Sequence, residues 1–73
     1  MVDDIDIFTF LKSEYNKDST MFFNVHEIME ALEVDEEDIL LVKNPLEDGV
    51  DAGDYERRIA KDKAWYRYRE IDE

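Results

Sequence analysis

The sequence predicts a small α+β domain in which three helices precede a C-terminal antiparallel hairpin. Up to about residue 46, apolar residues recur every three or four positions, which is the spacing of one helix face. Residues with good capping chemistry divide this stretch into three helices. The segment after residue 54 instead concentrates Trp65, Tyr66 and Tyr68, and aromatic residues favour strands.

Length and composition fit one domain over residues 1–73. Hydrophobic residues make up 44% of the chain, which is enough to build a core, and no apolar run approaches the roughly 18 residues that span a membrane. Cysteine is absent, which excludes disulfides and thiolate catalysis and is typical of a reducing compartment. We therefore expect a cytoplasmic protein with no membrane partner.

The net charge of −12 is unevenly distributed. Residues 1–54 hold 16 acidic and three basic residues, a net charge of −13, whereas residues 55–73 hold five acidic and six basic residues, a net charge of +1. A negative field repels polyphosphates at long range. Nucleic acid could therefore approach only the C-terminal segment.

The first helix is expected over about residues 5–16. Ile5, Phe8, Leu11 and Tyr15 follow helical spacing and predict its inward face. Acidic residues at positions 3, 4 and 6 suit the positive end of the helix dipole. A strand over residues 5–7 is the alternative, but the stretch is longer than a typical strand.

The second helix is expected over about residues 25–32, after a very short apolar run at residues 21–23 that could form one strand. Asn24 is a good N-cap, and Glu27 stands in the capping-box position three residues later. The inward positions are then Val25, Ile28, Met29 and Leu32.

The third helix is expected over about residues 35–46, capped by Asp35, with Ile39, Val42 and Leu46 inward. Pro45 lacks an amide donor and disfavours a helix interior, so the helix is expected to kink or stop near residue 44. The Asp48-Gly49 pair would end whatever remains.

The last element, over about residues 55–71, is expected to be two strands joined by a tip at Lys61-Asp62-Lys63. A helix capped by Asp54 is the alternative, because residues 56–61 are fair helix formers.

This order of elements resembles the winged helix-turn-helix superfamily of small transcription regulators. Residues 24–32 are similar to its capped second helix, Val34-Asp35 to its turn, residues 46–50 to the end of its third helix, and residues 55–59 and 64–69 to its wing strands. Two departures are Glu33, where a small residue or glycine is usual, and Pro45 inside the third helix.

The resemblance implies a third helix that enters the DNA major groove, but the charges oppose this. Residues 33–48 hold seven acidic residues and one base, Lys43. Duplex DNA carries one negative charge per about 1.7 Å of axis, so like charges would face one another along the groove. Function belongs to the site rather than to the fold.

A partner-binding face is expected on the third helix. Leu41 would point away from the inward positions and lie among acidic and polar neighbours, and an apolar residue ringed by acids can anchor a basic protein surface. The predicted contact residues are Glu37, Asp38, Leu41 and Asn44. The alternative is that Pro45 turns Leu41 inward.

A second candidate site is the basic hairpin, whose bases are interleaved with aromatic residues that could stack on nucleic-acid bases. The predicted contact residues are Arg57, Arg58, Lys61, Lys63, Arg67 and Arg69. The alternative is that these bases pair with the surplus carboxylates while the aromatic side chains pack on the core.

No metal, cofactor or catalytic site is expected. The carboxylates at positions 48, 51, 54 and 56 do not match the calcium-loop spacing, and His26 is the only histidine. No Gly-rich phosphate loop is present, and no hydroxyl nucleophile has a base placed beside it.

These observations together predict a non-catalytic acidic module that acts by protein–protein interaction in transcription or nucleic-acid regulation, with DNA mimicry as a special case. The expected partner is a protein with a basic surface, and a homodimer remains open. The alternative is a small transcription regulator that contacts DNA through its basic wing.

Overall fold

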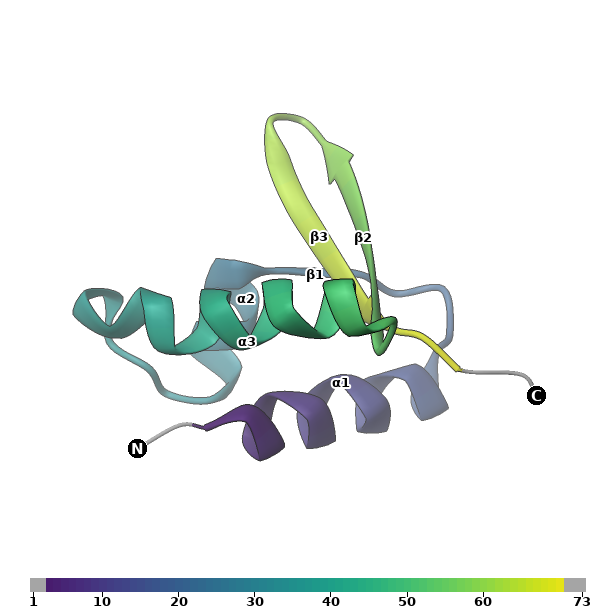
Figure 1. The fold of residues 1–73 in the computed structure, drawn as a ribbon, viewed down its shortest axis with the longest axis horizontal. Coiled ribbons are helices and arrows are strands. Elements are labelled where there is room, and N and C mark those ends of the chain that lie inside the picture. Colours follow the sequence, from purple (N-terminus) through teal and green to yellow (C-terminus); the bar gives the residue numbers. More distant parts are fainter. Residues whose placement is uncertain (1–2, 71–73) are drawn as a thin grey trace.

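Three helices precede most of a three-stranded antiparallel sheet in the computed structural model, which describes residues 3–70 (Figure 1). The helices are α1 (Asp4–Lys17), α2 (Val25–Ala31) and α3 (Ile39–Ala52), with a short 3-10 helix, η1 (Glu36–Asp38), before α3. The strands are β1 (Phe23–Asn24), β2 (Tyr55–Ala60) and β3 (Lys63–Tyr68), in the sheet order β1-β3-β2. The predicted α+β class is confirmed, and the layout is consistent with that of a winged helix.

Helix α1 begins at a reciprocal cap. The Asp3 carboxylate accepts the Asp6 amide at 3.2 Å, and the Asp6 carboxylate accepts the Asp3 amide at 3.2 Å. The fully buried residues are Ile7 and Leu11, whereas Ile5 is 73% exposed. The prediction that Ile5 faces inward is wrong, because α1 carries apolar residues on two adjoining faces and tertiary packing selects the face with Ile7 and Leu11.

The capping box of α2 is confirmed. The Asn24 side chain accepts the Glu27 amide at 2.8 Å, and the Glu27 carboxylate accepts the Asn24 amide at 3.1 Å. The connection after α2 turns at Glu33, whose φ of 57° lies in the left-handed region that glycine adopts most easily. Glu33 therefore holds the position at which the resemblance implies a small residue.

The predicted start of the third helix at Asp35 is wrong. Asp35 makes no side-chain capping hydrogen bond, and residues 36–38 form η1, so the α-helix itself begins at Ile39. A 3-10 turn is a common way to enter an α-helix.

The predicted stop near residue 44, the predicted helix end at about residue 46 and the predicted ending at Asp48-Gly49 are also wrong, because α3 continues through Pro45 and Gly49 to Ala52. Proline in a helix interior costs about 3 kcal/mol. On either side of it, Val42 and Leu46 are fully buried, and burial of two such side chains contributes about 1.5–3 kcal/mol each. The helix ends at Gly53, whose φ is 88°.

Strands β2 and β3 form the predicted hairpin, in a register that runs from Tyr55 opposite Tyr68 to Ala60 opposite Lys63. Lys61 and Asp62 have φ values of 53° and 64°, as a two-residue turn that suits strand twist requires. The helical alternative for this segment is excluded, and the predicted end at residue 71 lies outside the described residues. In Figure 1 the hairpin rises away from the layer formed by α1 and α3.

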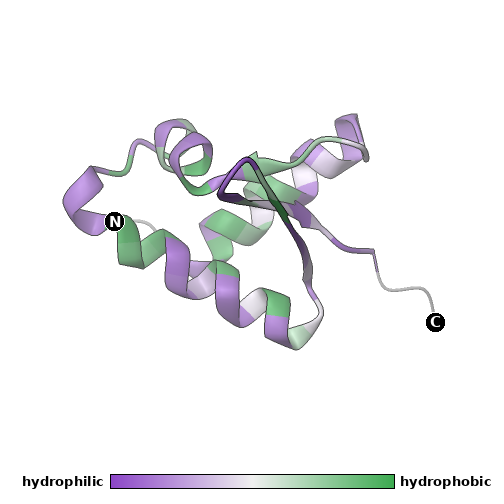
Figure 2. Cartoon of the chain, turned by 90° about the horizontal axis from the view of Figure 1, so that it is seen from above, coloured by the Kyte–Doolittle hydropathy of each residue, from purple (hydrophilic) through white to green (hydrophobic). Residues whose placement is uncertain are grey.

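The core lies where α1, α2 and α3 meet one another and the base of the sheet. Figure 2 shows apolar and hydrophilic residues alternating along each helix, as expected for helices that bury one face. The buried residues are Ile7, Leu11, Ile28, Met29, Val42, Leu46, Tyr55 and Tyr66. The distal part of the hairpin and the η1 end of the molecule contribute none of them.

Candidate functional site

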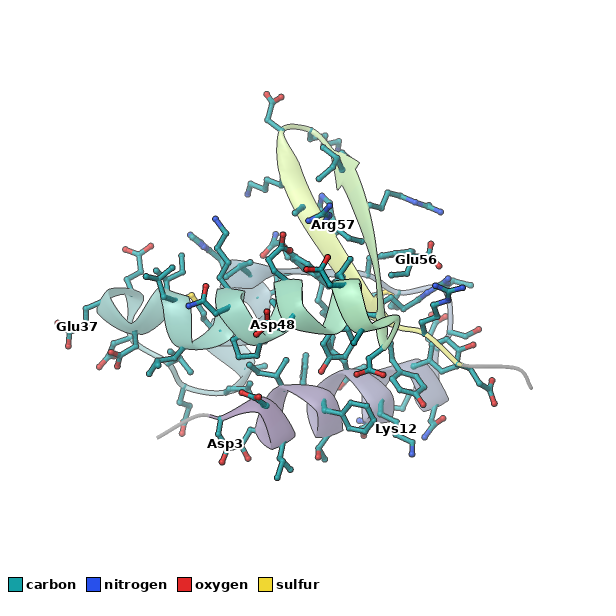
Figure 3. All side chains as sticks on the ribbon, viewed as in Figure 1. Asp3, Lys12, Glu37, Asp48, Glu56 and Arg57 are labelled. Carbon is teal, nitrogen blue, oxygen red and sulfur yellow. The ribbon has the colours of Figure 1, made fainter. Side chains whose placement is uncertain are left out.

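The four residues predicted to contact a partner are all exposed, but they face two directions. Asp38 and Leu41 line a hollow between α1, the α2–η1 connection and the start of α3. Glu37 projects at the free end of the helical layer (Figure 3) and adjoins the hollow without lining it, because its carboxylate lies within 4.8 Å of that of Asp38. Asn44 is exposed on α3, one helical turn after Leu40, and does not line the hollow. The structure therefore divides the predicted face into two surfaces.

The first surface, which we call the acidic hollow, has a volume of about 600 Å³. Four of its lining side chains carry a carboxylate and the other four are aliphatic, and no basic side chain lines it. The lining residues are Asp6, Ala31, Leu32, Glu33, Val34, Asp35, Asp38 and Leu41. An acidic cavity with aliphatic walls can accept a cationic side chain together with its hydrocarbon stem.

Three carboxylates gather at the rim of the acidic hollow. Oxygen atoms of Asp35, Glu37 and Asp38 lie within 4.8 Å of one another, and all three residues are exposed. Within residues 3–70 this is the only such group of three or more potential metal ligands, so Asp48, Asp51, Asp54 and Glu56 are not brought together. Exposed acidic groups commonly lie this close without an ion, and the acidic cluster adds to the negative potential of the hollow.

The second surface is the outer face of α3, which carries the exposed residues Leu40 and Asn44. Its most exposed apolar residue, Leu40, was not among the residues predicted from the sequence. Leu40 is 58% exposed, compared with 40% for the predicted Leu41. Helical spacing places the two leucines about equally far from the inward positions, so spacing does not separate them. The difference arises because Leu41 lies on the side of α3 that borders the acidic hollow.

Arg57 of the basic hairpin faces α3 and is held there. It forms an ion pair with Glu47, whose other carboxylate oxygen accepts the Tyr66 hydroxyl at 2.7 Å. Burial, followed by the hydrogen bond to Glu47, raises the pKa of Tyr66 above its usual range. Arg57 thus joins β2 to α3 and neutralises one of the acids of the third helix.

The opposite, outer face of the sheet carries a cationic and aromatic network. Arg67 pairs with Glu56 at 2.8 Å and donates to the Ser19 carbonyl at 2.5 Å. Its guanidinium lies 4.6 Å from the ring centroid of Phe22, and that of Arg58 lies 4.8 Å from the same centroid. Arg67 is therefore part of the packing. Arg58 instead remains available to solvent, because its side chain is 65% exposed and its ion pair with Glu56 is long, at 3.8 Å.

The remaining hairpin bases, Lys61, Lys63 and Arg69, form no ion pair with any carboxylate of residues 3–70. The same holds for Lys43 of α3. Lys63 and Lys43 both line a groove of about 250 Å³ between the hairpin and α3. The predicted wing residues thus divide into Arg57 and Arg67, which are held by the fold, and four bases that are exposed to solvent.

Comparison with known proteins leaves the chain without an assigned family: no family model, no curated protein and no solved structure matches it. Along the part of the chain that the structure describes, the helices are too short or too polar to cross a bilayer.

Proposed function

We propose that this chain is a non-catalytic binding module that holds a basic, partly apolar segment of a protein partner in its acidic hollow. The observation that carries the proposal is the lining of the hollow, in which four carboxylates and four aliphatic side chains surround a volume of about 600 Å³ with no base among them.

The chemistry of the hollow selects arginine or lysine side chains. Their hydrocarbon stems can pack on Leu32, Val34 and Leu41, while the cationic heads meet the carboxylates. The net charge of −12 attracts a basic surface at long range and raises the association rate. Apolar anchoring adds contact energy that depends on shape, which a diffuse acidic surface does not supply.

The same features argue against seating α3 in the DNA major groove and suit a nucleic-acid-binding protein as the partner. The exposed cluster of Asp35, Glu37 and Asp38 stands at the end of the chain segment that the resemblance would place in the groove. A basic protein that binds phosphates could accept these carboxylates in their place, so DNA mimicry is one form of the proposed function.

Fluorescence anisotropy with a labelled amphipathic peptide of lysine, arginine and leucine tests this proposal. The variant Glu33→Gln/Asp38→Asn removes two charges from the hollow and should weaken binding by at least about tenfold, since charge-assisted contacts are among the stronger ones. Neither side chain makes a capping hydrogen bond that its replacement would lose.

The matched control is Glu30→Gln/Asp51→Asn, which removes the same charge from exposed positions outside the hollow. This variant should bind within about twofold of the wild type, as expected for a small change in long-range attraction. Equal losses of affinity in both variants would mean that the peptide responds only to the net charge of the protein, which would refute the hollow as the binding site.

A second candidate function is contact with nucleic acid through the wing, favoured by the exposed bases of the hairpin. Arg58 is 65% exposed beside Phe22, and Lys63 has no ion pair within residues 3–70. Cationic and aromatic side chains together suit a phosphate backbone or stacked bases.

A gel-shift series at rising salt tests this alternative. Arg58→Glu/Lys63→Glu is the informative variant, because Arg57 and Arg67 are held by internal contacts and their loss would also disturb the fold. Binding through the wing requires a shift that weakens steeply with salt and disappears in this variant. Absence of any shift at low salt would end the alternative.

A further inference from the structure

An exposed leucine near the start of α3 lies between an acidic side chain of η1 and a basic side chain of α3. Leu40 is 58% exposed. Glu37 precedes it by three residues and Lys43 follows it by three, and both are exposed. Residues three apart lie close to one helical turn from each other and so share a side of the helix. The surface therefore has an apolar centre with opposite charges at nearly equal distances on either side.

Neither of these charges is satisfied within residues 3–70. Lys43 forms no ion pair there, although acidic residues outnumber basic residues by 21 to nine. Glu37 also forms no ion pair, and its carboxylate lies within 4.8 Å of those of Asp35 and Asp38. A cation beside Glu37 and an anion beside Lys43 would each lower the electrostatic energy.

The arrangement is complementary to itself. In a two-fold symmetric interface the same patch lies on both subunits, so each contact occurs twice. When a second α3 lies antiparallel to the first about an axis at Leu40, the residue three before that leucine meets the residue three after it. The rise per residue places each charge about 5 Å along the axis from Leu40, on opposite sides.

We propose that two copies of this chain pair through this surface, with the two Leu40 side chains in contact and Glu37 of each copy beside Lys43 of the other. A second copy places an opposite charge beside each of the two unpaired side chains and also covers the leucine. Glu37, Leu40 and Lys43 do not line the acidic hollow, so the pairing does not rest on the proposed function, although the Glu37 carboxylate lies within 4.8 Å of those of Asp35 and Asp38 at its rim.

Analytical ultracentrifugation of the full chain tests the pairing. At an ionic strength of about 0.15 M the Debye length is about 8 Å, so long-range repulsion between the acidic chains is screened while contact pairs persist. Glu37→Lys alone and Lys43→Glu alone should each weaken self-association by at least about tenfold, because two attractive contacts become two repulsive ones.

Equimolar mixing of these two variants gives the sharpest result. In a mixed pair the unchanged Lys43 of one chain lies beside the unchanged Glu37 of the other, and the introduced lysine lies beside the introduced glutamate, so attraction returns at both contacts. The mixture, and also the double variant Glu37→Lys/Lys43→Glu alone, should regain association to within about threefold of the wild type, as charge complementarity is restored.

Glu30→Lys and Lys61→Glu are the controls, because they make the same changes in net charge at exposed positions away from the surface. Both should associate like the wild type. A wild type that remains monomeric up to about 1 mM would overturn the proposal. So would failure of the mixture to associate, or a loss with Lys43→Glu that Glu37→Lys does not share, which would mean that Lys43 does not lie beside Glu37 of the second copy.

Discussion

Replacement of Gly49 by alanine sets a gain in helix propensity against a steric clash. Gly49 lies inside α3 and is buried against the ring of Tyr55, which is itself 5% exposed. In an unobstructed helix interior the substitution stabilises by up to about 1 kcal/mol. Sequence alone would therefore predict a more stable protein.

The structure predicts the opposite sign. A Cβ at Gly49 would stand 2.3 Å from both Cδ2 and Cε2 of Tyr55. Carbon atoms prefer separations of about 3.5–4.0 Å, so the ring or the helix must move by more than about 1 Å. Such overpacking typically costs about 1–3 kcal/mol, and two contacts this short with a buried ring place the cost in the upper part of that range, at about 2–3 kcal/mol. Subtracting the propensity gain of about 1 kcal/mol leaves a net destabilisation of roughly 1–2 kcal/mol. For a domain of this size the melting temperature should fall by roughly 4–16 °C.

Urea and thermal denaturation followed by circular dichroism measure this effect. Tyr55→Leu removes the ring atoms that clash, so in that background Gly49→Ala should be clearly less destabilising than in the wild type. Asp51→Ala, at an exposed position of the same helix, controls for propensity alone and should not destabilise. A Gly49→Ala protein as stable as the wild type would refute the close approach of α3 to Tyr55.

Three further outcomes are expected. Raising the salt concentration from about 0.01 M to 0.3 M should raise the melting temperature, because 21 acidic residues against nine basic residues repel one another and salt screens them; a flat response would contradict this. Asn24→Ala removes the acceptor of the 2.8 Å bond from the Glu27 amide and should lower the free energy of unfolding by about 1 kcal/mol in urea titrations, and an unchanged midpoint would count against the cap. Burial, with Asp54 nearby, raises the pKa of Tyr55 to about 12, so the contribution of Tyr55 to stability is complete below the unfolded pKa near 10 and is lost as the pH rises through about 12. The urea midpoint should therefore be level up to about pH 9.5 and then fall. A decline that begins near neutral pH would argue against tyrosine ionisation as the cause.

Local chemistry could be predicted from the sequence where the interacting groups lie three or four residues apart. The capping box of Asn24 and Glu27 is an example, because each side chain reaches the backbone of the other within a single turn. The C-terminal hairpin followed from its aromatic residues, and the uneven charge followed from composition. None of these depends on how the elements pack.

Tertiary structure decided which of two equivalent faces each element buries. Helix α1 has apolar residues on two adjoining faces, and packing buried Ile7 rather than Ile5. Leu40 and Leu41 are equally placed by helical spacing, but only Leu41 borders the acidic hollow. Similarly, Arg57 is held by its contact with α3, and Arg67 is held by its contact with the segment before β1. Arg58 lacks such a contact with α3 and remains exposed.

The sequence by itself determined the helices, the hairpin and the excess of negative charge, since local hydrogen bonds and composition do not require a partner element. Only the tertiary structure decided the length of α3 and the position of the acidic hollow. Pro45 penalises the helix locally, and the burial of Val42 and Leu46 by distant elements offsets that penalty. The hollow gathers residues from position 6 to position 41, and only folding brings carboxylates so far apart in the chain to one cavity.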